Sequence, residues 1–265
     1  MASVIWSSCG AAARMMQGRV ELARILAVTN QKGGVGKTTT AVNLSACLAA
    51  LGQRVLMIDL DPQGNATTGC GVIKREALPT VYQILIGRST LVDARIKTEF
   101  GFDILPANRE LAGAEVELIE MGGREFRLRD ALAPVLGDYD FILMDCPPAL
   151  NMLTVNGLVA AEAVMIPMQC EYYALEGLTD LVATLKKVRA NLNSRLEIEG
   201  LLRTLFDPRS TLTQQVSAEL DEHFGRKVYR TIIPRNVRLA EAPSYGKPVI
   251  AFDRSSKGAQ AYMAL

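Results

Sequence analysis

The densest group of residues that could do chemistry is a glycine-rich segment with two lysines that ends in threonines. It consists of Lys32, Gly33, Gly34, Val35, Gly36, Lys37, Thr38 and Thr39. Glycine lacks a Cβ, so the backbone can turn successive N–H groups inward and approach phosphate oxygens closely. A lysine adds a charge for the β- and γ-phosphates, and the hydroxyl that follows it can bind Mg²⁺. The segment therefore predicts a nucleoside triphosphate site in which Lys37 and Thr38 have these two roles.

Three aspartates follow apolar runs, at points where strands of a sheet would end. Asp59 and Asp61 come after residues 54–58, and Asp145 comes after residues 141–144. Ligands of open α/β sheets bind at the carboxyl ends of strands, where a carboxylate can bind Mg²⁺ through water or orient an attacking water. Aspartate is also common where turns begin, and both segments continue into proline. Beside a phosphate loop, all three aspartates are candidates for a metal or catalytic site.

The lysine at the start of the loop departs from the general phosphate-loop pattern. That pattern has a glycine five residues before Gly36, whereas Gln31 stands there and Lys32 follows it. The loop backbone and Lys37 already serve the phosphates of their own subunit, which leaves the second lysine no phosphate to bind there. Lys32 is either an ordinary solvated loop lysine or a charge that acts outside its own subunit.

Short apolar runs alternate with helical patterns along most of the chain. The runs cover residues 25–28, 54–58, 102–105, 141–144, 163–166, 198–202, 228–233 and 249–251. Near-continuous apolar runs of this length predict strands buried on both faces, as in a parallel sheet. Between them apolar residues recur at helical spacing, for example before Gly52 and from Leu175 to Val188. The alternation predicts an α/β fold with a doubly wound, mostly parallel β-sheet flanked by helices, in one domain over residues 23–265.

The overall composition excludes several classes of protein. The chain has 265 residues and a net charge of +1, so it is not a wholesale polycation. His223 is its only histidine, which excludes a multi-histidine zinc site. The five cysteines are scattered without a C-x-x-C pair, which indicates reduced thiols rather than a disulfide framework. No apolar run approaches the ~18 residues that a membrane span needs.

Residues 1–22 differ in composition from the rest of the chain. They lack the basic start and the sustained apolar stretch of a signal peptide. We expect a disordered leader or a misassigned start, with a short targeting or partner-binding arm as the alternative.

Positive charge is concentrated near the end of the chain. Residues 226–257 carry a net charge of +6, and the remainder carries −5. Such a division can present a positive face to the phosphates of DNA, although a solvated charged face gives the same composition. No aromatic ladder, zinc finger or helix-turn-helix pattern accompanies it. Any DNA binding should therefore be independent of sequence and sensitive to salt.

The loop from Lys32 to Thr38 resembles the deviant Walker A family, K-G-G-x-G-K-[ST], whose members include ParA/Soj partition proteins, MinD and the nitrogenase iron protein. Residues 171–177 and 233–244 look specifically like chromosomal ParA/Soj proteins, and with the other motifs the match covers essentially residues 24–265. The resemblance implies a P-loop ATPase of the MinD/ParA superfamily that uses ATP and Mg²⁺.

The resemblance also assigns roles to individual residues. Lys32, Lys37 and Asp61 would be catalytic, with Lys32 reaching the phosphates of a partner subunit and Asp61 positioning the attacking water. Thr38, Asp59 and Asp145 would be the residues at the magnesium ion. Nucleotide would contact residues 32–39 and Asp61, with Pro234, Arg235 and Asn236 against the adenine. Arg209 and Arg238 would contribute to non-specific DNA binding.

The resemblance implies a switch that works in the cytoplasm on the nucleoid. ATP would join two subunits in a homodimer that binds double-stranded DNA, and slow hydrolysis would release it. The partner would be a ParB-type centromere-binding protein whose basic N-terminal segment stimulates hydrolysis, and no membrane would be involved. Relatives usually continue a final helix beyond Tyr262 and Met263, so we expect the end of this chain to be shortened.

Three other classes of protein share the loop. A MinD-like positioning ATPase at the membrane requires a C-terminal amphipathic helix, for which residues 253–265 offer few apolar side chains. A redox protein like the nitrogenase iron protein needs cluster-binding cysteines at matching spacing. A small-substrate kinase or synthetase needs an acceptor-binding motif, and none is evident.

Overall fold

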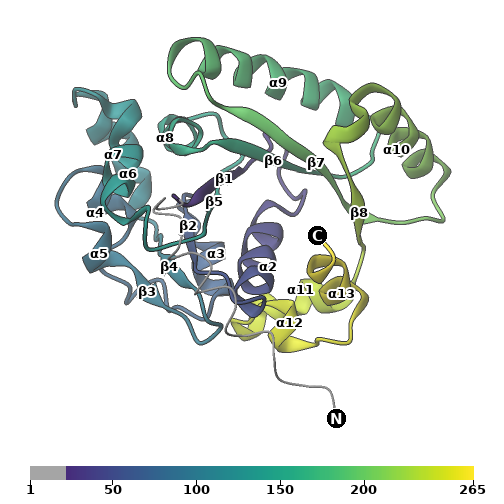
Figure 1. Cartoon of the computed structure of the whole chain (residues 1–265), viewed down its shortest axis with the longest axis horizontal. Helices are drawn as coiled ribbons and strands as arrows, with labels where there is room; N and C mark the ends of the chain where they lie inside the picture. Colours follow the sequence, from purple (N-terminus) through teal and green to yellow (C-terminus); the bar gives the residue numbers. More distant parts are fainter. Residues whose placement is uncertain (1–21) are drawn as a thin grey trace, which may run out of the picture.

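Eight strands form one sheet in residues 22–265, the part of the chain that the computed structural model describes (Figure 1). They are β1 (Arg24–Val28), β2 (Val55–Asp59), β3 (Ile96–Lys97), β4 (Asp103–Leu105), β5 (Phe141–Asp145), β6 (Ala163–Met168), β7 (Glu197–Phe206) and β8 (Val228–Pro234). Their order is β3-β4-β2-β5-β1-β6-β7-β8, and all neighbours are parallel except β3 and β4. The predicted fold class is confirmed. The leader expected at residues 1–22 lies outside the described residues, apart from Leu22.

Helices cover both faces of this sheet. They are α2 (Lys37–Ala50), α3 (Asn65–Gly69), α4 (Val81–Leu85), α5 (Leu91–Ala94), α6 (Leu111–Ile119), α7 (Arg127–Leu132), α8 (Met152–Ala160), α9 (Ala174–Asn191), α10 (Thr211–Phe224), α11 (Val237–Glu241), α12 (Val249–Phe252) and α13 (Lys257–Met263). Figure 1 shows α9 and α10 above the sheet, and α2 with α11–α13 below it. Among the described residues, no helix has both the length and the apolar composition of a membrane span.

The strands supply side chains to two hydrophobic cores, one on each face. Leu56 and Ile58 pack into the core that α4 and α6–α10 cover. Val55 and Met57 point the other way, into the core beneath α2 and the C-terminal helices. Side chains alternate along a strand, so a strand covered on both faces needs apolar residues at every position. This explains why the apolar runs of the sequence predict these strands well.

Two details differ from the sequence prediction. The apolar run 249–251 lies in the short helix α12 and not in a strand. Its first residue, Val249, is fully buried, and its N–H donates to Oδ1 of Asn43 on α2 at 2.6 Å. The run is apolar because it packs against a helix, which periodicity alone cannot distinguish from a buried strand. The second difference is β3, a two-residue strand that is too short to give a pattern.

The three predicted site segments meet at one edge of the sheet. In the register of the sheet, Asp145 at the end of β5 pairs with Val28 at the end of β1 and with Asp59 at the end of β2. Three residues, Thr29, Asn30 and Gln31, connect the end of β1 to the glycine-rich loop, which leads into α2. Parallel pairing therefore places the loop and both aspartate segments side by side at the carboxyl ends of three central strands.

Candidate nucleotide-binding site

The glycine-rich loop has the backbone conformation that the sequence predicts. Gly34 and Gly36 have φ values of +74° and +84°, in the left-handed region that side chains with a Cβ rarely adopt. Helix α2 begins directly after Gly36, and no side chain caps its first turn. The N–H groups of that turn and the positive end of the helix dipole are therefore available to an anion.

Hydrogen bonds from two neighbouring strands hold the loop in place. The buried hydroxyl of Thr204 on β7 donates to the carbonyl of Val35 at 2.7 Å. At the start of the loop, Nδ2 of Asn30 donates to the carbonyl of Pro167 on β6 at 2.9 Å, and Oδ1 of Asn30 accepts the N–H of Lys32 at 3.0 Å. The cradle is therefore preorganised by β6 and β7 as well as by its own glycines.

Lys37 lies inside this cradle. Its side chain is buried, and its amine donates to the carbonyl of Lys32 across the loop at 3.0 Å. Burial lowers the pKa of the amine, while the negative charge of Asp145 acts in the opposite direction. The lysine thus spans the loop from within, and its contact with a phosphate chain stays a prediction.

Lys32 points out of the same loop. Its side chain is 42% exposed, and its amine forms an ion pair with Oε2 of Glu171 at 2.5 Å. Glu171 is itself half exposed and precedes α9. An ion pair between two exposed side chains contributes only about 0–1 kcal/mol, so this lysine can change partners at little cost. The backbone of Lys32 belongs to the loop, whereas its charge lies outside.

Asp145 is a buried carboxylate that receives no hydrogen bond from the described residues. Both of its oxygens are buried and lack a hydrogen-bond partner there. Burial raises the pKa of this carboxyl well above its usual range; the charge of Asp59 adds to the rise, and the nearby Thr38 hydroxyl opposes it. Buried polar groups without partners are rare and usually mark a site for an ion or a water. Asp145 and Thr38 supply the hard oxygen donors that suit Mg²⁺.

Asp59, in contrast, is held by several donors. Its Oδ2 accepts the hydroxyl of Thr67 at 2.7 Å and the N–H of Thr67 at 2.8 Å, and its Oδ1 accepts the N–H of Asp61 at 3.1 Å. Burial nevertheless raises its pKa. Its hydrogen bonds also fix the start of the turn that carries Asp61, a partly buried residue whose Oδ1 accepts the N–H of Gln63 at 2.9 Å. Asp59 is therefore placed to support Asp61, while its charge disfavours a second negative charge on Asp145.

Comparison with known proteins agrees with this site. A family model described as an AAA domain matches residues 23–198. The chain is 53% identical to the chromosome partitioning protein ParA of Caulobacter vibrioides, with 91% of this chain and 92% of that protein covered. It is 52% identical to the sporulation initiation inhibitor protein Soj of Bacillus subtilis, with 92% and 97% covered. This chain belongs to the ParA/Soj family of chromosome-partitioning ATPases.

Solved structures of the same fold include nucleotide complexes. A Mycobacterium smegmatis chain described as cobyrinic acid a,c-diamide synthase, with bound ADP and magnesium, has a TM-score of 0.81 and 40% identity, with 92% of each chain covered. The cell division ATPase MinD of Pyrococcus furiosus has a TM-score of 0.75 and 25% identity, with 91% of this chain and 96% of that chain covered. The fold of this ParA/Soj family member is therefore shared by proteins of several names.

Sequence reasoning missed the residues that hold the site from a distance. Thr67, Thr204 and Glu171 contact Asp59, the loop and Lys32 respectively. Two of these contacts join residues more than one hundred positions apart. Nothing in the sequence next to such a residue indicates that it will contact a distant segment in the folded chain.

Other residues that the family resemblance assigns lie further along the sheet. Pro234 ends β8, the third strand from β1, and Arg235 and Asn236 follow it. The N–H of Arg235 donates to the carbonyl of Phe206 at 3.1 Å. Asn236 caps α11 by accepting the N–H of Leu239.

The two arginines assigned to DNA are exposed but paired with acids. Arg209, whose side chain is 88% exposed, forms a bidentate pair with Asp207 at 2.8 and 2.9 Å. Arg238 pairs with Glu241 at 2.9 Å and with Asp253 at 3.3 Å. Their guanidinium groups face solvent, and the carboxylates beside them partly neutralise their charge.

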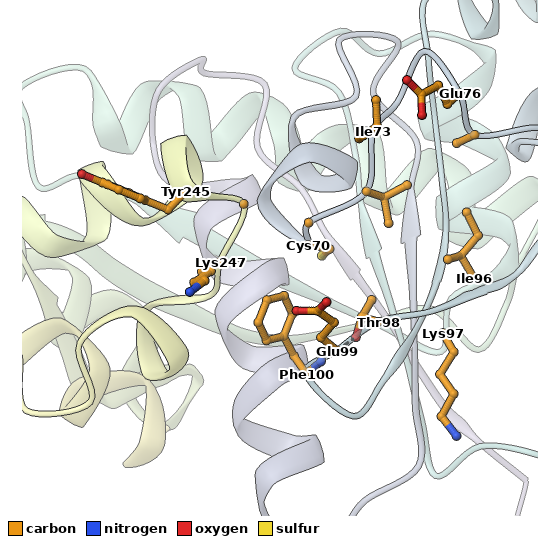
Figure 2. Close-up of a pocket in the computed structure, with 14 residues that line it drawn as sticks. Cys70, Ile73, Glu76, Ile96, Lys97, Thr98, Glu99, Phe100, Tyr245 and Lys247 are labelled. Carbon is orange, nitrogen blue, oxygen red and sulfur yellow. Dashed lines mark hydrogen bonds between the residues drawn. The ribbon is translucent and has the colours of Figure 1, made fainter.

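A cavity of about 480 Å³ lies elsewhere, between the segment after α3, the turn before β4 and residues 245–247. Figure 2 shows Lys97, Lys247 and Glu76 on different sides of it rather than converging on one point. Ligand sites usually have a few polar groups aimed at one ligand position. We therefore assign the nucleotide to the loop and not to this cavity.

The buried aspartates predict how the stability of the nucleotide-free protein depends on pH. Their raised pKa values mean that the folded chain binds protons more tightly than the unfolded chain. Its free energy of unfolding should therefore fall as the pH rises from about 4, the ordinary value for aspartate, through about 6, the raised pKa of Asp59. Asp145→Asn should make this fall smaller, because it removes one of the two carboxyls whose pKa burial raises.

Urea unfolding at pH 5 and pH 7.5, in EDTA and without nucleotide, measures the effect. Asp180→Asn on the exposed side of α9 is the matched control and should keep the wild-type pH dependence. An unchanged slope in Asp145→Asn would contradict the assignment of a destabilising charge to this residue.

Proposed function

We propose that the chain is a magnesium-dependent ATPase that acts as a molecular switch in chromosome or plasmid partitioning. ATP joins two copies in a homodimer, which binds double-stranded DNA without sequence preference. Slow hydrolysis to ADP and phosphate then releases the DNA, and a ParB-type centromere-binding protein accelerates this step. Two relatives, each 53% identical to this chain and named chromosome partitioning protein ParA and chromosome-partitioning ATPase Soj, support the proposal.

The opposite placement of the two loop lysines carries the proposal. Lys37 is buried within the cradle, while Lys32 is exposed and held only by a solvent-exposed ion pair. A second subunit that faces the loop could accept the Lys32 amine at its own phosphates. Positive charge delivered across an interface stabilises the charge that develops during phosphoryl transfer, as an arginine finger does. Dimer formation and catalysis would then depend on the same residue.

The described residues suit ATP and Mg²⁺. Backbone N–H groups of the loop and the first turn of α2 would bind the phosphates together with Lys37. Thr38 and Asp145 would hold Mg²⁺, and Asp59 would support Asp61, whose N–H it accepts. When bound, the metal supplies positive charge that favours attack on the terminal phosphate.

Asp61 is the residue that would position the attacking water. It is partly open to solvent, unlike Asp59 and Asp145, which are fully buried. Its Oδ1 accepts the N–H of Gln63, and its carboxylate would accept a hydrogen bond from the attacking water. Slow hydrolysis suits a switch, since the ATP-bound state must last long enough for a partner to respond.

DNA binding would rely on exposed arginines and therefore on phosphate contacts. Arg209 and Arg238 lie on loops or helices that follow β7 and β8, on the side of the sheet that carries the positively charged part of the sequence. Such contacts are independent of sequence and weaken as salt rises. An assembly of this kind would work in the cytoplasm in association with the nucleoid.

Lys32→Ala should abolish ATP-driven dimerisation and the DNA binding that depends on it. The reason is that the substitution removes the only charge that we assign to the neighbouring subunit's phosphates. Sedimentation velocity with a non-hydrolysable ATP analogue and Mg²⁺ measures the dimer. Lys186→Ala, an exposed lysine on α9, is the control and should dimerise as wild type does. Normal dimerisation of Lys32→Ala would refute the trans-acting lysine.

Asp61→Ala should keep ATP-dependent dimerisation and DNA binding but lose hydrolysis by about two orders of magnitude or more. The substitution removes the group that orients water and leaves the loop and both buried aspartates intact. Phosphate release and DNA binding, measured on the same preparation, separate the two properties. Turnover at the wild-type rate would show that another group positions the water.

The acids beside the two arginines should limit DNA affinity. Arg209→Ala and Arg238→Ala should each weaken ATP-dependent DNA binding and lower the slope of log affinity against log salt by about 1. Asp207→Asn should act in the opposite direction, because it leaves Arg209 without its neutralising carboxylate. Fluorescence anisotropy over a salt series measures both effects, with the exposed Arg75→Ala as control. Weaker binding by Asp207→Asn would contradict the role of Arg209.

A further inference from the structure

Helix α6 exposes apolar side chains to solvent on the side away from the core. Leu111, Ala114 and Leu118 are buried, whereas Val116 and Ile119 are 70% and 61% exposed. These two residues are three apart, and residues with this spacing lie on the same side of a helix. Single exposed apolar residues are common on protein surfaces. Neighbouring ones on one helix face can form part of a contact surface for another molecule.

Leu150, in the loop after β5, extends this apolar area. It is 49% exposed, and the next residue, Asn151, donates from Nδ2 to Oε1 of Glu115 on α6 at 2.6 Å. The loop therefore lies against the helix. We call Val116, Ile119 and Leu150, with the glutamates on and beside α6, the α6 surface.

The glutamates of the α6 surface are bonded mainly to neutral groups. They are Glu110, Glu115, Glu117 and Glu120. Gln83 donates to Glu110, Asn151 to Glu115 and the hydroxyl of Tyr82 to Glu117. The nearby cations are Arg109, Arg88 at 3.8 Å from Glu117, and Arg124, whose guanidinium donates to the carbonyl of Ile119 at 2.7 Å and pairs with Glu125. Within residues 22–265, no partner is recorded for the side chain of Glu120. The surface is therefore apolar at its centre and negative in its net charge.

Two short connections join the α6 surface to the nucleotide site. The N–H of Ala107, in the segment that leads to α6, donates to the Thr67 hydroxyl at 2.9 Å, and that hydroxyl donates to Asp59. On the other side, Asn151 caps α8 and lies in the segment that follows Asp145. A molecule that displaced α6 or the 146–151 segment would act on the surroundings of both buried aspartates.

We propose that the α6 surface is the docking site for a basic amphipathic segment of a partner protein. Its apolar side chains would cover Val116, Ile119 and Leu150, and its lysines or arginines would pair with the glutamates. DNA and anionic lipid surfaces are repelled by the same charges. A two-fold contact with a second copy would bring two acidic surfaces together. Charge complementarity therefore selects a cationic protein segment.

The docking site is separate from the proposed DNA-binding residues. Figure 1 shows α6 beside α4 and α7, on the opposite side of the molecule from α11 and α13. A partner on α6 could therefore act while DNA occupies the arginines. An effect of docking on ATP hydrolysis rests on the proposed function, but the binding itself does not.

Binding of a synthetic probe tests the docking site directly. The probe is a fluorescently labelled 18-residue peptide with leucines at helical i, i+3, i+4 and i+7 spacing and lysines elsewhere. A scrambled peptide of the same composition is its control. Anisotropy with nucleotide-free full-length protein should show binding of the amphipathic peptide that is stronger than that of the scrambled one. Val116→Ser with Ile119→Ser should weaken it about ten-fold, as loss of two central apolar contacts predicts.

Matched variants and a second measurement complete the test. Ile73→Ser with Val92→Ser removes equivalent side chains that are 55% and 53% exposed elsewhere, and it should bind the peptide as wild type does. Glu120→Lys should weaken binding, most strongly at low salt. Hydrogen exchange with the bound peptide should show protection in residues 109–121. Equal affinity in both double variants, or protection confined to other residues, would overturn the docking site.

Hydrolysis is measured separately, so that the two proposals fail independently. If the peptide binds α6 but the protein does not hydrolyse ATP, the docking site stands and the proposed ATPase function fails. If the protein hydrolyses ATP but the peptide does not bind, the docking site fails and the proposed ATPase function stands. A loss of ATP-driven dimerisation in Val116→Ser with Ile119→Ser, without a change in peptide binding, would assign the surface to a second copy instead.

Discussion

A buried carboxylate without a hydrogen-bond partner is the constraint on which the site depends. Asp145 ends the central strand β5, with β1 on one side and β2 on the other. Removing a charge from water costs several kcal/mol unless a partner compensates, so this residue destabilises the nucleotide-free fold. The two hydrophobic cores that enclose the sheet must offset that cost. A cation bound at this edge relieves it, which couples ligand binding to the stability of the whole sheet.

The fold separates the two lysines of one short loop into different environments. Left-handed glycines at positions 34 and 36 bend the loop around the Lys37 amine, while Lys32 contributes its carbonyl inside and its charge outside. Thr204 and Asn30 fix this arrangement from neighbouring strands. A loop that was held only by its own backbone could let either lysine enter the cradle. The strands beside the loop therefore help to keep the charge of Lys37 inside the cradle and the charge of Lys32 outside it.

Sequence reasoning recovered those parts of the structure that depend on local pattern. The central strands are apolar at every position because both faces are covered, and the glycine loop and aspartates follow strand ends directly. The run 249–251 was misread because burial against α2 leaves the same apolar signature as burial in a sheet. Thr67 and Glu171 were missed because their roles arise only when distant segments meet. The roles of Asp61, Arg209 and Arg238 come from family resemblance, and the geometry adds their exposure and their ion pairs.

Leu205 indicates how the phosphate loop and the DNA-facing residues could influence each other. It has a φ of +49°, in the left-handed region, and it lies where the pairing of β7 with β8 changes register. Such a conformation in a residue with a side chain costs about 1–3 kcal/mol and persists only when its surroundings enforce it. Its neighbours do so, since Thr204 holds the carbonyl of Val35 and Phe206 accepts the N–H of Arg235.

Asp207, two residues after Leu205 and directly after β7, pairs with Arg209. A nucleotide that shifted the loop would act on Thr204, the residue directly before Leu205 in the chain. The contacts thus join the phosphate cradle, the end of β8 and an arginine assigned to DNA through four consecutive residues, Thr204 to Asp207, the last of which lies just after β7. A switch needs an element with two arrangements that both ligands can bias, and the end of β7 is the described segment with the contacts and the strain to be that element.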